Sequence, residues 1–190
     1  MTGREAAMAI SGALRLARFD LKGAFFFNAT VKGFWNSFWV AAILAPLHLL
    51  EIMLVWQEEP ATTQALRFFS VEAIMYVMGW TAFPLAMVYV CNWIDRSNRF
   101  LRFGIANNWT DLIVSAVFIP VQLAITLDLL TGTLMSALLA AVIVYAMALA
   151  WFIARYTLNL SGLAAAGVVI LAVFINWIVR GFGETLIYAI

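Results

Sequence analysis

Five long apolar runs constrain this chain more than any other feature of its sequence. A helix needs about 20 mostly apolar residues to cross the hydrocarbon core of a bilayer, and runs of that length lie at residues 34–56, 68–93, 109–130, 134–156 and 162–185. Of the 190 residues, 65% are hydrophobic and only 11% are charged, so a soluble fold of this size would leave much apolar surface in water. The sequence predicts an all-α, polytopic membrane helix bundle with about five transmembrane helices.

The break between the third and fourth runs is short, because only Gly132 and Thr133 interrupt the apolar sequence there. We expect a tight helical hairpin at this point. Four spans are the alternative, if the two runs merge or one of them is not a span. Each run is long enough to cross a bilayer alone, so five spans are the primary prediction.

Basic residues are distributed unevenly about the five predicted spans. Nine of the eleven Lys and Arg residues fall on the side of the amino terminus: Arg4, Arg15, Arg18, Lys22, Lys32, Arg96, Arg99, Arg102 and Arg155. Arg67 and Arg180 fall on the other side. Basic loops are retained in the cytoplasm, so the pattern predicts a cytoplasmic amino terminus and a carboxyl terminus on the opposite side. The expected location is the bacterial inner (plasma) membrane.

The first 32 residues form a cytoplasmic tail in this prediction, and residues 33–190 form a single transmembrane bundle. Apolar residues of the tail recur close to helical spacing: Ile10, Leu14, Ala17 and Leu21. Basic residues lie between them: Arg15, Arg18 and Lys22. This pattern indicates an amphipathic helix on the membrane surface, with the three cations in contact with lipid headgroups. The alternative is a loose tail.

Polar residues within the apolar runs give a candidate site: His48, Glu51, Glu72 and Arg180. His48 and Glu51 share a helix face, and Glu51 and Glu72 would lie at one depth in an antiparallel hairpin. Carboxylates inside membranes usually face the protein interior or a watery cavity, and one interpretation of the cluster is a proton or ion relay. The other interpretations are side chains that reach the interface, and a structural lock on Arg180.

Small residues begin the fifth run and mark a predicted helix-packing face: Ser161, Gly162, Ala165 and Ala166. Their spacing of four lets another helix approach closely. The pattern leaves open whether that helix belongs to the same chain. It also leaves open whether the fifth helix continues through Gly181 and Gly183 or ends there.

Other residues are expected to mark boundaries or bends. Asp111 follows the predicted start of the third span, where negative charge stabilises a helix amino terminus. Trp109 is expected at the inner interface, as in an aromatic belt.

Three prolines lie inside predicted spans, Pro46, Pro84 and Pro120. Each removes a backbone hydrogen bond and can kink its helix, either to open a cavity or simply to pack.

Recognisable catalytic motifs are missing from the sequence, including a nucleotide-binding glycine loop, a paired-histidine zinc motif and a nucleophile elbow. We therefore expect no enzyme activity, no cofactor and no metal. The net charge of +1 provides no basic excess for nucleic acid. The sequence favours an accessory or scaffold protein that binds the bilayer and other membrane proteins or a second copy. The alternative is a small proton- or ion-coupled transporter or channel subunit using Glu51, Glu72 and His48.

Two stretches resemble the Yip1 family of five-span membrane proteins. One is a polar cytoplasmic loop, Asn92–Arg102, that leads into a proline-containing third span. The other, Tyr145–Ala164, turns tightly into a small-residue helix. The resemblance implies a cytoplasmic amino terminus and a five-helix bundle. Eukaryotic members are tied to vesicle traffic and small GTPases, but their Asp-Leu-Tyr-Gly-Pro signature is absent here, and no catalytic residue is carried over.

Overall fold

The computed structural model describes residues 1–57, 59, 63–127, 129 and 132–188. These residues form seven α-helices and a short 3-10 helix, without any strand. The elements are α1 (Gly3–Leu16), η1 (Leu21–Phe26), α2 (Val31–Ser37), α3 (Trp39–Trp56), α4 (Ala65–Trp93), α5 (Ser97–Thr126), α6 (Thr133–Thr157) and α7 (Gly162–Tyr188). The predicted all-α helical bundle is confirmed.

Five segments are long and apolar enough to cross a membrane: Val31–Trp56, which joins α2 and α3, and the helices α4, α5, α6 and α7. Their most apolar windows have a mean hydropathy between 1.6 and 2.4. The chain is an integral membrane protein, and its five candidate spans equal the number predicted.

The start of α5 differs most from the sequence prediction. This helix begins at Ser97 rather than at residue 109, so Arg99 and Arg102 lie in its first turns. Only three residues, 94–96, separate α4 from α5, and the stretch Asn92–Arg102 is mostly helical rather than a loop. Phe103, within this added length of helix, is 2% exposed, so the segment before residue 109 packs into the core. The other predicted end of this span, residue 130, lies outside the described residues.

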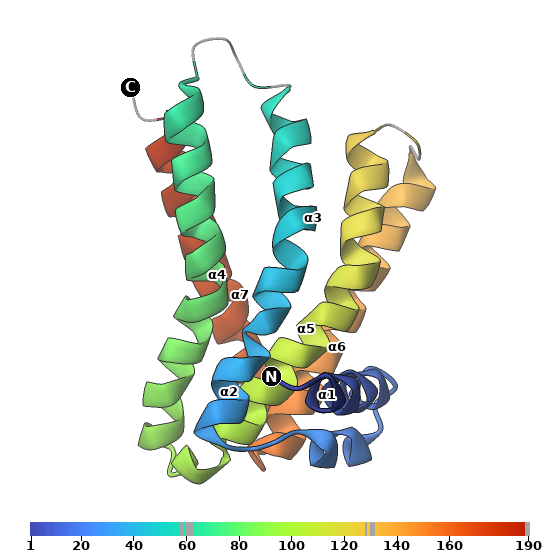
Figure 1. Cartoon of the computed structure of the whole chain (residues 1–190), viewed down its shortest axis with the longest axis vertical. Coiled ribbons are helices and arrows are strands. Elements are labelled where there is room, and N and C mark those ends of the chain that lie inside the picture. The colour runs from blue at the N-terminus through green and yellow to red at the C-terminus, as the bar shows by residue number, and fades with distance from the viewer. Residues whose placement is uncertain (58, 60–62, 128, 130–131, 189–190) are drawn as a thin grey trace.

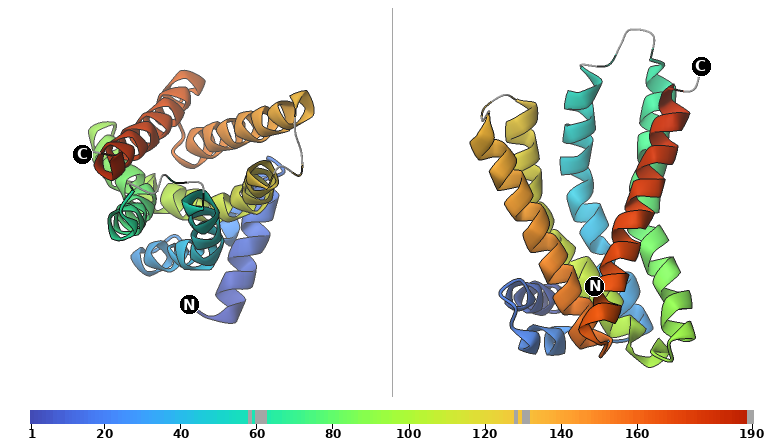
Figure 2. Two further views of the ribbon diagram at one scale, coloured as in Figure 1. Left: turned by 90° about the horizontal axis from the view of Figure 1, so that it is seen from above. Right: turned by 180° about the vertical axis from the view of Figure 1, so that it is seen from behind.

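The candidate spans converge at one end and diverge at the other (Figure 1). We call the end beside α1, η1 and α2 the N-terminal end, and the opposite end the far end. At the far end, α4 and α7 lie on one side and α5 and α6 on the other, with α3 between them. The same divergence is visible from behind (Figure 2).

Most of the hydrophobic core lies in the halves of the helices next to the N-terminal end. Its central side chains include Val40, Met87, Cys91, Phe103, Ile105, Trp109, Leu149 and Ile153. Trp109 is 2% exposed, so it is a core residue and not an interfacial anchor. The longer α5 explains this correction, because Trp109 lies three turns inside the helix rather than at its start.

A small hydrophobic cluster joins α4 to α7 at the far end: Phe68, Val71 and Ile187. The helix α7 continues through Gly181 and Gly183 to Tyr188. Gly183 lies so close to Met75 of α4 that any added side chain would overlap it. Glycine here permits close helix contact instead of ending the helix.

The N-terminal segment is folded onto the bundle. The helix α1 lies crosswise to the spans, as Figures 1 and 2 show, and it contacts α5. Its inward face consists of small residues and one leucine: Ala9, Gly12, Ala13 and Leu16. The Tyr145 hydroxyl of α6 donates a hydrogen bond to the Ala17 carbonyl oxygen at 2.6 Å. The segment Gly3–Leu16 is therefore a docked helix and not a loose tail.

Candidate functional site

A cleft of about 540 Å³ lies between α3, α4, α5 and α7. It brings together one acidic or basic side chain from each of the four helices: His48 from α3, Glu72 from α4, Asp111 from α5 and Arg180 from α7. The other polar and aromatic lining residues are Tyr76, Trp80, Ser115, Asn176 and Trp177. Three of the four predicted site residues thus share one cleft. The fourth, Glu51, contacts His48 but is not part of the lining.

The cleft lies within the membrane-spanning segments. At 1.5 Å per residue, Glu72 is about 10 Å along α4 from its first residue, and Asp111 is about 21 Å along α5 from its first residue. Both carboxylates belong to candidate spans. Ionisable side chains at such depth are costly, and they usually line cavities or pathways.

The position of His48 is fixed by neighbours on two helices. Its Nδ1 lies 3.9 Å from a carboxylate oxygen of Glu51. Its ring stacks on Tyr76, with the centroids 4.6 Å apart, and the Tyr76 hydroxyl donates a hydrogen bond to the Ala41 carbonyl oxygen at 2.6 Å. The other ring nitrogen, Nε2, is buried and has no hydrogen-bond partner. A buried polar atom of this kind calls for a physical explanation.

Arg180 and Glu72 face the same cleft without a direct ion pair. No described carboxylate lies within 4.0 Å of the Arg180 guanidinium. The Arg180 guanidinium is nevertheless close enough to act electrostatically on Glu72. A tight structural lock of Arg180 on Glu51 or Glu72, one of the interpretations of the sequence, is not formed among the described residues.

Asp111 belongs to the cleft, and sequence reasoning missed it. It was expected to cap a helix amino terminus, but α5 begins at Ser97 and places Asp111 in the middle of the helix. The Asn107 side-chain amide donates a hydrogen bond to its carboxylate at 3.0 Å. No described basic side chain lies within ion-pair distance of it. The signal that could have found Asp111 is the apolar periodicity around Phe103, which extends the helix backward.

Asn176 was also missed, because one amide in an apolar run carries little information. Its side-chain amide donates one hydrogen bond, to the Ala172 carbonyl oxygen at 3.0 Å, and Asn176 lines the cleft. It lies four residues before Arg180, so the two share a face of α7. Only the arrangement of the four helices brings that face opposite Glu72 and Asp111.

The predicted small-residue face lies mainly against α6 of the same chain. Ala165 is fully buried, and Ala166 is partly buried. A methyl group on Gly162 would lie 3.5 Å from both Trp151 and Arg155, and the Trp151 indole donates to the Gly162 carbonyl oxygen at 2.9 Å. The Ser161 hydroxyl is exposed and accepts a hydrogen bond from the backbone nitrogen of Ala164.

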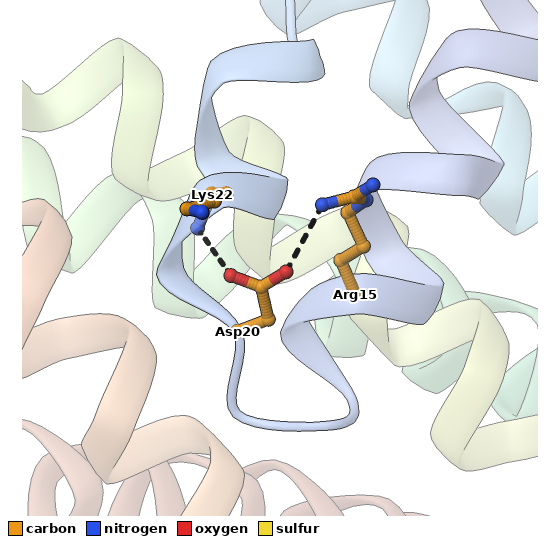
Figure 3. Close-up of polar contacts among 3 residues, drawn as sticks. All are labelled: Arg15, Asp20 and Lys22. Atoms are coloured by element: carbon orange, nitrogen blue, oxygen red, sulfur yellow. Dashed lines mark hydrogen bonds and ion pairs between the residues drawn. The ribbon is translucent and has the colours of Figure 1, made fainter.

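The predicted headgroup-contacting cations differ in their surroundings. Arg15 donates to the Asp20 carboxylate at 3.1 Å and lies over the Phe26 ring at 5.2 Å. The other Asp20 oxygen accepts a hydrogen bond from the backbone nitrogen of Lys22 at 2.9 Å, as Figure 3 shows. Arg18 and Lys22 are exposed. Contact of these three residues with headgroups stays a prediction.

In the part of the chain that the structure describes, no group of three or more His, Cys, Asp or Glu side chains is placed to hold a metal ion. No model of a known protein family matches the chain, and no curated protein or solved structure matches it. The resemblance to the Yip1 family therefore stays a prediction. The candidate function rests on the geometry of the cleft.

Proposed function

We propose that this protein is a small membrane transporter or channel subunit that passes a proton or a small charged solute through the polar cleft. The observation that carries the proposal is the convergence of His48, Glu72, Asp111 and Arg180, from four different helices, on one cleft inside the spans. Such residues are rare within membranes and commonly mark ion or substrate pathways. The volume of about 540 Å³ is within the range of small-molecule sites.

The proposal includes an orientation and a membrane. Nine of the eleven basic residues precede the first span or lie at or near the span ends on the same side, which supports a cytoplasmic N-terminal end. We place the protein in a bacterial inner membrane, with the far end toward the opposite side. Five spans are few for a monomeric carrier, so the working unit in this proposal is a homo-oligomer.

Liposome flux tests the proposal. Purified protein is reconstituted into liposomes that contain a pH-sensitive dye, and flux is measured under an imposed pH gradient. We expect Glu72→Gln and Asp111→Asn to abolish flux, because each removes an ionisable group from the cleft. Asp95→Asn is the matched control, since Asp95 lies outside the cleft at a positive φ of 55° that asparagine tolerates well. Flux at the wild-type rate in both cleft variants would contradict the proposal.

An accessory or scaffold protein without catalytic chemistry is the second candidate. It is favoured by the outward face of α7, where Ala164 and Gly167 are exposed and nothing lies within 4 Å of a methyl group placed on Gly167. Small exposed residues permit close contact with a helix of another chain. Purification in a gentle detergent is expected to yield an oligomer or a bound membrane protein, and Gly167→Leu is expected to disrupt it. A strictly monomeric chain without a partner would count against this candidate.

A further inference from the structure

The charges that line the cleft do not balance. Glu72 and Arg180 carry opposite charges and act on each other across the cleft. Asp111 has no described basic side chain within ion-pair distance, and its side-chain partner is the neutral amide of Asn107. With Asp111 ionised and His48 neutral, the lining carries one negative charge in excess. A buried carboxylate without a counter-charge is unfavourable and tends to take up a proton, so a ligand with one positive charge would stabilise the ionised form of Asp111.

Aromatic rings distinguish between kinds of cation. Trp80, Tyr76 and Trp177 all line the cleft beside the carboxylates. His48 already covers one face of Tyr76, whereas Trp80 forms a T-shaped pair with Tyr76, with the centroids 6.4 Å apart. The face of an indole ring attracts an ammonium group and packs against apolar substituents.

A bare metal ion fits this lining less well than an organic cation. Calcium takes six to eight oxygen ligands and magnesium requires octahedral geometry, whereas the described residues hold no group of three acidic or histidine ligands. Apolar side chains complete the lining: Met75, Val114 and Val179. Together these features favour a protonated amine with an apolar substituent.

We propose that the cleft binds a monovalent organic cation, an alkyl- or arylammonium ion, with its charge beside Asp111 and its apolar substituent against Trp80. The inference rests on the proposed function, because it names the class of solute that the cleft would carry. It assigns Asp111 as the residue that neutralises the ligand and Trp80 as the residue that selects for its apolar part.

The test is equilibrium binding to the full chain in detergent micelles, followed by tryptophan fluorescence and calorimetry. The probe is 2-phenylethylammonium. Two analogues share its apolar part: neutral 2-phenylethanol and zwitterionic phenylalanine. We expect saturable binding of the ammonium ion and at least tenfold weaker binding of both analogues. Asp111→Asn is expected to weaken ammonium binding at least tenfold, and Trp80→Leu about tenfold. Asp111→Glu keeps the charge and is expected to retain binding, and Asp95→Asn serves as the control outside the cleft.

The inference is overturned by any of three results: no saturable ammonium binding, wild-type affinity in a folded Asp111→Asn variant, or tighter binding of phenylalanine. The last result would assign a zwitterion that pairs with both Asp111 and Arg180. Monodispersity and helical content establish that each variant is folded. Binding in micelles requires no transport, so ammonium binding without flux in liposomes would contradict the proposed function but not this inference. Proton flux without ammonium binding would contradict this inference but not the proposed function.

Discussion

The two ends of the bundle are built from the same helices but packed differently. At the N-terminal end, α3, α4, α5, α6 and α7 share one continuous core with α1. At the far end, the spans diverge (Figure 1), and the described hydrophobic cluster there is the small group Phe68, Val71 and Ile187 between α4 and α7. The polar cleft is lined by side chains of α3, α4, α5 and α7, the helices that converge at one end and diverge at the other.

This difference separates two tasks that one helix bundle can perform. The packed end holds the helices in a fixed arrangement, because close-packed interiors resist deformation. Where that packing ends, polar side chains that are costly in a membrane face one another across a cleft. A bundle that served only as an anchor would have no need for acidic and basic side chains at that depth. The comparison leads to four predictions about stability, in order of decreasing effect.

The largest effect is expected from a cavity in the packed end. Phe103 is 2% exposed, and Phe103→Ala is expected to reduce the free energy of unfolding by about 3–5 kcal/mol. Phe182→Ala is the control, because Phe182 is 62% exposed on α7. Denaturation in detergent micelles measures both variants. Equal losses of stability would mean that the N-terminal end does not dominate the stability of the bundle.

A smaller effect is expected where α1 docks. A methyl group on Gly12 would lie 2.8 Å from the Gly23 carbonyl oxygen, so Gly12→Val is expected to displace α1 and to cost about 1–3 kcal/mol through overpacking. At Gly3, nothing lies within 4 Å of an added methyl group, and Gly3→Val serves as the control. Limited proteolysis of the N-terminal segment distinguishes local release of α1 from unfolding of the bundle. Protection of α1 equal to that of the wild type would show that its contact with η1 tolerates a larger separation.

Neutralising the cleft is expected to have the opposite consequence from a core substitution. Asp111→Asn removes an intramembrane carboxylate that has no described basic partner, and it keeps the size of the side chain. The free energy of unfolding should therefore stay the same or rise by up to about 1 kcal/mol. Thermal unfolding in micelles gives the midpoint. A large decrease in the midpoint would show that Asp111 stabilises the packing of the bundle, and its role would then be structural.

The sequence was sufficient to predict the elements that depend on composition. The five candidate spans were found because each contains an apolar run of spanning length. The docked helix α1 was found by its periodicity, but its inward face of Ala9, Gly12 and Ala13 was not. Small residues carry weak hydropathy signals, and the larger residues Ile10 and Leu14 are exposed instead. The start of α5 was missed because arginines mask the helical pattern there.

The candidate site was predictable only in part, for a related reason. His48, Glu72 and Arg180 are conspicuous as polar residues within long apolar runs, and depth arguments place them near one another. Asp111 and Asn176 enter the cleft because α5 and α7 both pack against α4, which depends on tertiary packing and not on local sequence. Glu51 shows the reverse case, because it shares a helix face with His48 but does not line the cleft.

The smallest effect concerns the pH dependence of α1 docking. The side-chain amides of Asn36 and Asn28 donate hydrogen bonds to the Glu5 carboxylate, and the bond from Asn36 is the main cause that holds the pKa of Glu5 below its ordinary value of 4.5. The lowered pKa means that the contact contributes fully above pH 4.5 and is lost as the pH falls through the folded-state pKa. Hydrogen exchange of α1 amides is therefore expected to speed up slightly below pH 4.5.

Glu5→Gln supplies the control for this last effect, because the amide cannot ionise. Its α1 exchange should lack the acid-dependent acceleration once the intrinsic effect of pH on exchange is removed. The change should be confined to α1, since the hydrogen bonds of the Glu5 carboxylate run to Asn28 and Asn36 at the N-terminal end. An acid-dependent acceleration that persists in Glu5→Gln, or that reaches α6, would locate the titrating group elsewhere. Acceleration that reaches α6 would also show that the N-terminal segment and the spans open as one cooperative unit, because α1 would then not open separately from the packed end.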